Sequence, residues 1–336
     1  MRNLLSMTSG TLSGNFNRNI ANWNVVSVTN LQGAFDPKTS DPLSSAFKKS
    51  MYTAWGATLQ AVYPLWSAGT AYTAITQSNI AAAVTEWVTI PTTATTTYGP
   101  ISEWDTSAVT SMSAVFQSKG TFNGDISAWN TASVSNMNSM FSSAAAFNQN
   151  IASWNTASVS NMNSMFSGAI VFNQNLGAWN TAKVSVMSSM FDAAKAFNQN
   201  IGGWDVAAVA NFARMLAQAN AFNQNIGNWN TASVTTMFAT FQAASAFNQD
   251  ISSWNTAAVT SMLAAFQLAS VFNANIGSWN VARVTTLGSM FSGDSSGSTK
   301  FNQNIGSWNV ASVTTLGTLC WTASILFISI SIIIKL

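Results

Sequence analysis

The sequence predicts an α/β solenoid, a stack of similar repeats that each contribute one short strand and one short helix to a shared core. Tryptophan and phenylalanine residues recur at one constant interval along most of the chain. The tryptophans are Trp104, Trp129, Trp154, Trp179, Trp204, Trp229, Trp254 and Trp279. The phenylalanines are Phe122, Phe147, Phe172, Phe197, Phe222, Phe247 and Phe272. A fixed period in the range of about 20 to 50 residues is typical of stacked repeat architectures.

The first half of each repeat predicts a strand of a few residues around one aliphatic position. In the repeat that begins at Phe147, this segment is Asn150-Ile151-Ala152. The same position is occupied by Ile126, Ile151, Leu176, Ile201, Ile226, Ile251, Ile276 and Ile305. Strands from successive repeats would form a parallel ladder with a spacing of about 4.8 Å.

The second half of each repeat predicts a short helix, because its apolar residues are spaced as on one helical face. In the same repeat these residues are Val159, Met162, Met165 and Phe166. Asn155, Thr156 or Ser158 would cap the start of the helix, and Gly168 would end it. In a later repeat Arg214 enters the predicted helix Asn211–Leu216, which we interpret as an ordinary packing substitution.

Two recurring residue types admit a structural and a functional interpretation. The tryptophans are interpreted as core residues, and the alternative is an exposed row for stacking on sugars. One column of Asn follows Phe and comprises Asn123, Asn148, Asn173, Asn198, Asn223, Asn248, Asn273 and Asn302. A second column follows Trp and comprises Asp105, Asn130, Asn155, Asn180, Asp205, Asn230, Asn255, Asn280 and Asn309. We interpret both as satisfying backbone groups at corners and between repeats, with ligand binding as the alternative.

Composition argues against several classes of function. Charged residues make up 7% of the chain, against about 25% in a typical domain. There is no His, and Cys320 is the one Cys, which removes most metal sites and nucleophile–base pairs. The net charge of +2 comes from dispersed residues, which does not suit nucleic acid. We therefore predict no cofactor, no metal and no enzymatic activity.

The chain divides into four predicted regions. Residues 1–35 contain one orphan or partial repeat of a preceding array, and residues 36–98 form a helical insertion without repeats. Helices are expected over 43–59 and 80–88 of this insertion, and the second would cap the open end of the array. Residues 99–318 form the main array of about nine repeats, with a surface loop inside 292–300. Residues 319–336 form a hydrophobic tail.

Both ends of the sequence lead to expectations about placement. The start has no apolar segment typical of a secretion signal, and the abrupt onset of the repeats at Phe16 indicates a truncated N-terminus. The tail over 319–336 is at the short limit for a membrane span. The main alternatives are a lipid-anchor signal and an artefact of the gene model, and a hydrophobic end cap ranks behind them.

The repeated phrase Phe-Asn-Gln-Asn-Ile, Trp-Asn-Thr, Val-Thr-x-Met and Met-Phe resembles the BspA-type leucine-rich-repeat surface proteins. The resemblance covers residues 16–35 and about 98–319. It implies a leucine-rich-repeat-like, right-handed stack with short parallel strands on one side and short helices on the other. It also implies a cell-surface or secreted protein with a role in adhesion or binding, and it brings no catalytic residues.

The expected function is therefore adhesion or a structural coat, through a flat, neutral and repetitive face beside the aliphatic column. The candidate binding residues are Gln149, Asn150, Gln174, Asn175, Gln199, Asn200, Gln224, Asn225, Gln249 and Asp250. Such a face suits a repetitive partner: a surface polysaccharide, a mineral or ice-like lattice, a surface protein of a host or neighbouring cell, or another copy. Membrane contact is expected only through 319–336. The alternative function is a module that recognises a repetitive polysaccharide.

Overall fold

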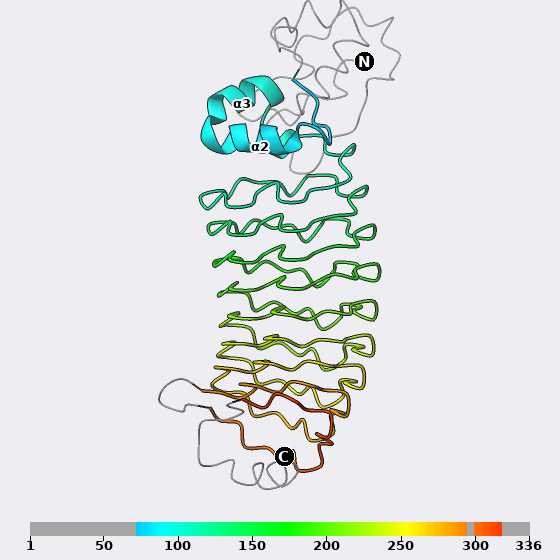
Figure 1. Ribbon diagram of the computed structural model, residues 1–336. Helices are drawn as coiled ribbons and strands as arrows, with labels where there is room; N and C mark the ends of the chain where they lie inside the picture. The colour runs from blue at the N-terminus through cyan, green and yellow to red at the C-terminus, as the bar shows by residue number, and fades with distance from the viewer. Residues whose placement is uncertain (1–71, 294–298, 318–336) are drawn as a thin grey trace, which may run out of the picture. The chain divides into compact units, whose positions relative to one another are not determined.

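The computed structural model describes residues 72–293 and 299–317 (Figure 1). The described residues belong to two compact units. One contains residues 72–74 and 90–104, and the other contains residues 75–89, 105–293 and 299–317. The orphan repeat over 16–35, the helix predicted over 43–59, the tail over 319–336 and most of the inserted loop lie outside the described residues.

The smaller unit contains helix α3, Pro91–Tyr98, and the 3-10 helix η2, Ile101–Glu103. Helix α3 has a proline in its first turn, where the missing N–H costs no intrahelical bond. The sequence predicted no helix in this Thr-rich segment. Its hydroxyls fold back on the helix instead, as in the bond from Thr95 Oγ1 to the Pro91 carbonyl at 2.7 Å.

The larger unit begins with helix α2, Ile80–Thr89, which confirms the helix predicted at 80–88. One apolar face of α2 is buried: Ile80, Ala83 and Val84 are each no more than 1% exposed. An isolated helix of this length would be marginal in water, so the burial of this face accounts for its stability.

Successive repeats lie side by side in parallel register, as the coils from green to orange show in Figure 1. Each bridge joins equivalent positions of adjacent repeats, and the last spans the inserted loop. The bridges are Ser111–Asn136, Asn136–Asn161, Asn161–Val186, Asn211–Thr236, Thr236–Ser261, Ser261–Thr286 and Thr286–Thr315. These pairings hold the repeats that they join against each other by backbone hydrogen bonds.

The predicted position of the strand ladder is wrong. The segment around Ile151 is a turn, not a strand, and the parallel bridges lie in the second half of the repeat, at Asn136 and Asn161. The aliphatic side chain is nevertheless buried as expected, since Ile151 and its counterparts from Ile126 to Ile276 are fully buried. The apolar spacing located the core residues but did not identify the backbone conformation that carries them.

The short helix predicted in each repeat is also wrong. Among the described residues, α-helix is confined to α2 and α3. Between 162 and 169 the N–H groups alternate between two kinds of partner. Met165, Ser167 and Ala169 donate to carbonyls three residues earlier, at 3.2, 3.1 and 3.0 Å. Ser164, Phe166 and Gly168 donate to carbonyls of the next repeat, at 2.9, 2.9 and 2.7 Å.

This alternation explains the misleading apolar pattern. In an α-helix each N–H group bonds the carbonyl four residues earlier. Here every second backbone N–H bonds a carbonyl of the next repeat instead. Consecutive three-residue turns then return Met162, Met165 and Phe166 to the interior, with the same spacing that a helical face would show. The expected capping residue Asn155 instead closes a turn onto the N–H of Ala157 at 3.0 Å.

The core consists of aromatic columns flanked by aliphatic ones. Phe166 lies between Phe141 and Phe191 of the adjacent repeats, with ring centroids 5.6 and 5.7 Å away. Within its own repeat it stacks on Phe172 at 4.1 Å. Parallel stacking of this kind is favourable beyond the area that it buries. All three neighbours are fully buried.

The interpretation of the tryptophans as core residues is confirmed, and an exposed row for sugar stacking is excluded for the described repeats. From Trp104 to Trp279 the repeat tryptophans are 3–4% exposed, and Trp308 is 8% exposed. From Trp154 to Trp308 the indole N–H groups bond to the preceding repeat, as in the bond from Trp204 to the Leu176 carbonyl at 3.0 Å. Such a bond satisfies a buried polar group that would otherwise be costly.

Two positions in the repeat adopt left-handed backbone geometry, although most repeats have a residue other than glycine there. One is represented by Ser139 and Ser164, both with φ of 52°, and the other by Ser143 with φ of 58°. At the second position Gly168 has φ of 72°. A left-handed conformation costs a residue with a side chain about 1–2 kcal/mol, so the bonds between repeats must outweigh this strain.

Replacing Ser143 with glycine is therefore expected to stabilise the protein. Relief of the left-handed strain exceeds the extra entropy of glycine in the unfolded chain, leaving a net gain of about 0.5–1 kcal/mol. Chemical denaturation measures the change. The matched control is Ser142→Gly, because Ser142 is not among the residues with positive φ, and it should lose stability. A loss in both variants would contradict this explanation.

Candidate functional site: the amide face

The candidate residues form two neighbouring columns, which we call the amide face. One column contains Gln149, Gln174, Gln199, Gln224 and Gln249, and the other contains Asn150, Asn175, Asn200, Asn225 and Asp250. The second column is exposed to solvent throughout, whereas all five Gln residues are half-buried. Because the segment around Ile151 is a turn, the amide face is a row of turns and not the face of a strand.

Each member of the Asn column closes its own turn. Asn200 Oδ1 accepts a hydrogen bond from the N–H of Gly202 at 2.9 Å, and Asn225 Oδ1 does the same with Gly227 at 2.9 Å. Asp250 bonds the N–H of Ser252 in the same way, at 2.9 Å. This side-chain-to-backbone turn is typical of Asn and Asp, and either residue can supply the accepting oxygen.

The Gln column holds neighbouring repeats together. Gln199 Nε2 donates to the carbonyl and to Oδ1 of Asn173, at 3.1 and 3.0 Å. Gln224 Nε2 donates to Asn198 Oδ1 at 2.9 Å. The same pattern joins Gln149, Gln174 and Gln249 to Asn residues of the preceding repeat.

The Asn column that follows Phe forms a ladder between repeats, as its structural interpretation predicts. Asn173 Oδ1 accepts the N–H of Asn198 at 2.9 Å, and Asn198 Oδ1 accepts that of Asn223 at 3.0 Å. The ladder continues to the N–H of Asn302 at 2.8 Å. The column that follows Trp closes local turns, as between Asn180 and Ala182 at 3.1 Å. The Asn side chains of both columns therefore accept hydrogen bonds from backbone N–H groups.

Structural bonds leave each repeat of the amide face with a defined set of free polar atoms. Within the described residues, the Asn side chains of this face spend Oδ1 on the turn and leave Nδ2 without a partner in the chain. The Gln side chains use Nε2 to bond the preceding repeat and leave Oε1 without a partner in the described residues. Each repeat thus presents an amide donor next to an amide acceptor, repeated at the spacing of the stack.

Two carboxylates interrupt this pattern. Asp125 and Asp250 occupy the Asn position in their repeats, and hydrogen bonds from the backbone and hydroxyl of Ser127 and Ser252, respectively, lower the pKa of each carboxyl below its ordinary value. Both are therefore ionised at neutral pH. They lie five repeats apart in the same column, which does not suit a cooperating acid–base pair.

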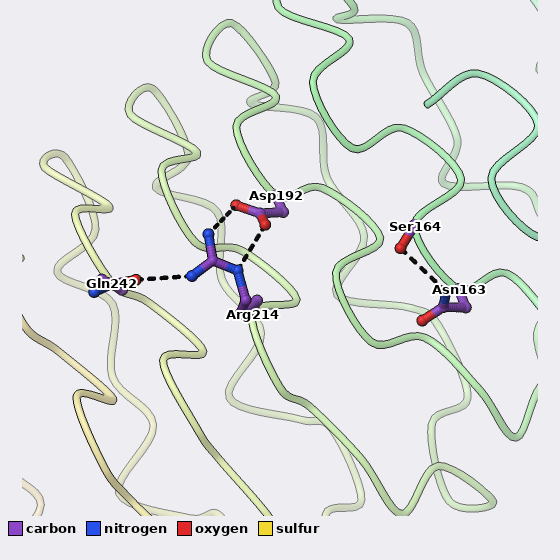
Figure 2. A network of polar contacts seen from close by, with 5 residues as sticks. All are labelled: Asn163, Ser164, Asp192, Arg214 and Gln242. Atoms are coloured by element: carbon purple, nitrogen blue, oxygen red, sulfur yellow. Dashed lines mark hydrogen bonds and ion pairs between the residues drawn. The ribbon is translucent and has the colours of Figure 1, made fainter. Parts of the chain in front are cut away.

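A polar network on another part of the repeat was not predicted (Figure 2). Arg214 donates to both carboxylate oxygens of Asp192, at 2.7 and 3.0 Å, and to Gln242 Oε1 at 3.1 Å. Gln242 Nε2 continues to Gln267 Oε1 at 2.6 Å. Our interpretation of Arg214 as an ordinary packing substitution overlooked this pair. The separation of the two charged residues in the sequence, close to one period, was the available signal.

Asn163, whose bond to Ser164 appears in the same view (Figure 2), also connects neighbouring repeats. Its Nδ2 donates to Ser164 Oγ at 3.1 Å and to Asn138 Oδ1 at 2.9 Å, while Ser188 Oγ donates to its Oδ1 at 2.5 Å. Within residues 72–293 and 299–317, no group of three or more Cys, Asp or Glu side chains is placed to hold a metal. The described helices include none with the length and apolarity needed to cross a membrane.

Comparison with known proteins identifies a family from sequence alone. No curated protein and no solved structure matches the chain significantly. One family model, DUF285, described as a Mycoplasma protein of unknown function, matches residues 2–56, 85–201, 161–271, 187–298 and 249–331. These overlapping matches cover most of the chain and follow its repeats, so the chain is a repeat protein that belongs to the DUF285 family.

Proposed function

We propose that this chain is a non-catalytic repeat protein of the cell surface or exterior, which acts in adhesion or as a structural coat through its amide face. The observation that carries the proposal is the row of exposed Asn Nδ2 donors and neighbouring Gln Oε1 acceptors, repeated along the stack. A uniform row of neutral hydrogen-bonding groups suits an extended partner with its own repeat.

The wider setting is part of the same proposal. The phrase Phe-Asn-Gln-Asn-Ile with Trp-Asn-Thr resembles BspA-type surface proteins, which supports an extracellular placement and a right-handed solenoid for the stacked repeats. The buried repeat tryptophans support a mode of binding without aromatic anchors. Hot spots of ordinary protein interfaces are enriched in aromatic residues and Arg, so the amide face suits many weak contacts along a repetitive surface.

Recognition of a repetitive polysaccharide is the second candidate. Sugar hydroxyls both donate and accept hydrogen bonds, so they complement the alternating Nδ2 and Oε1 groups of the amide face. The two candidates differ in partner but share the same residues. One set of variants can therefore test the face, and the choice of partner separates the functions.

The test replaces outward donors while keeping the turns. In Asn175→Asp/Asn200→Asp/Asn225→Asp, Oδ1 still accepts the backbone N–H, as Asp250 does at 2.9 Å, but the outward amide becomes a carboxylate oxygen. Beads coated with the full chain are offered to cells, to beads coated with the same chain, and to purified cell-wall polysaccharides. We expect the variant to lose most of the binding of the unmodified chain.

The matched control carries the same chemical change in the column that follows Trp. Asn180→Asp/Asn230→Asp/Asn255→Asp keeps equivalent turns, since Asp205 occupies this column naturally and bonds Ala207 at 3.0 Å. This control should bind as the unmodified chain does. Saturable binding to soluble polysaccharide that the first variant loses would favour the second candidate. Equal binding by both variants would refute a role for the amide face.

A further inference from the structure

Among the described residues, one side chain, that of Gln77, closes the edge of the first repeat of the main array at Thr110 and Ser111. Its Oε1 accepts the N–H of Thr110 at 3.0 Å, the N–H of Ser111 at 2.7 Å and the hydroxyl of Thr110 at 3.3 Å. Its Nε2 donates to the Ser111 carbonyl at 3.0 Å. A single carboxamide therefore satisfies the exposed hydrogen-bonding groups of both residues at this edge.

Further along the stack, the preceding repeat supplies the corresponding bonds. The N–H and hydroxyl of Ser135 both donate to the Thr110 carbonyl, at 2.8 and 3.3 Å. The Asn136 carbonyl accepts the N–H of Met112 at 2.8 Å. Gln77 thus places a carbonyl oxygen and an N–H donor where a preceding repeat would place its own.

Local bonds hold Gln77 in this position. The Asn79 side chain accepts the N–H of Thr76 at 2.8 Å, and the Ile80 N–H bonds to the Thr76 carbonyl at 3.1 Å. Ile80, at the start of α2, is 1% exposed. The turn that carries Gln77 is therefore anchored by the buried helix and does not depend on the edge contacts alone.

We propose that Gln77 terminates the ladder and that, without it, the edge of the first repeat pairs with the same edge of a second copy of this chain. An open edge presents unpaired N–H and C=O groups and is a template for strand addition. Charged side chains commonly prevent such pairing, but Thr110 and Ser111 are neutral, and charged residues make up only 7% of the chain. Pairing of identical edges gives a closed twofold dimer.

The test compares Gln77→Ala with the unmodified full chain. Hydrogen exchange at the amides of Thr110 and Ser111 should accelerate at least about tenfold in the variant at low concentration, because both N–H groups lose their acceptor. Sedimentation over a range of concentrations should show additional association in the variant, with a doubling of mass. Unchanged exchange or unchanged association would overturn the proposal.

Two further variants separate edge opening from general destabilisation. Gln77→Glu retains an accepting oxygen for both N–H groups but loses the Nε2 donor to the Ser111 carbonyl. It should keep most of the protection of the two amides, and its charge at the edge should oppose pairing, so that the mass stays that of the unmodified chain. Gln242→Ala removes a Gln outside the amide face whose Nε2 bonds Gln267 Oε1 of the next repeat at 2.6 Å, and it should not promote pairing. Association by Gln242→Ala equal to that of Gln77→Ala would assign the effect to loosened repeats and contradict the role of Gln77.

Discussion

Replacing Phe166 with alanine is expected to lower the free energy of unfolding by about 3–5 kcal/mol, the usual cost of removing a buried aromatic ring. Phe166 is fully buried and stacks on Phe141, Phe172 and Phe191. The cavity would interrupt the aromatic column across two interfaces between repeats. Because these neighbours are themselves held in stacked columns, the site cannot collapse to fill the space.

Denaturant unfolding followed by circular dichroism measures this loss. The matched control is Phe238→Ala, since Phe238 is 37% exposed and its removal leaves no comparable cavity. In a stack, each repeat contacts only its neighbours, so hydrogen exchange should accelerate first in the repeats around Phe166. Equal losses in the two variants would contradict the buried aromatic column.

Replacing Trp204 with phenylalanine is expected to lower the free energy of unfolding by about 1–3 kcal/mol. The ring is 3% exposed, and its Nε1 donates to the Leu176 carbonyl at 3.0 Å. Phenylalanine keeps part of the apolar contact but loses the indole bond and leaves a gap where the larger ring was. The Leu176 carbonyl keeps its second donor, the Trp179 N–H, at 3.1 Å. The measured loss therefore combines the bond between the two repeats with the packing of the indole ring.

Thr181→Val is the comparison for this prediction. Thr181 Oγ1 donates to the Asp205 carbonyl of the next repeat at 2.8 Å, and the side chain is 2% exposed. Two other repeats have valine at the position equivalent to Thr181, and these residues, Val206 and Val281, are buried as well. The stack thus accommodates valine here, and we expect a smaller loss than for Trp204→Phe. A larger loss for Thr181→Val would contradict the importance assigned to the indole bond.

The sequence was sufficient to predict which side chains face the interior. The constant period aligned Ile151, Trp154, Met162 and Phe166 with their counterparts, and all four are buried. It also supported the structural role of the Asn ladder, because Asn readily bonds backbone groups at turns. These predictions depend only on the repetition of residue types and on their polarity.

The path of the backbone could not be predicted from the same pattern. The spacing of Val159, Met162 and Met165 fits a helical face as well as it fits consecutive turns, and the choice depends on N–H bonds to the next repeat. Left-handed geometry at Ser139 and Ser164 leaves no mark in the sequence, because neither is glycine. The bond from Gln199 Nε2 to Asn173 likewise depends on the exact register of neighbouring repeats.

The central claim is that equivalent residues of successive repeats lie in direct contact along one stack. Paired cysteines test it most directly, in a chain that also carries Cys320→Ser. Ser135 and Ser160 are exposed, and the N–H of Ser160 bonds the Ser135 carbonyl at 2.9 Å. We predict that Ser135→Cys/Ser160→Cys forms an intramolecular disulfide on mild oxidation. The control pair Ser135→Cys/Ser185→Cys lies two repeats apart and should not form one. The reason is that a disulfide requires Cα atoms within about 7 Å. Failure of the first pair, or equal reaction of both pairs, would contradict the stacked arrangement.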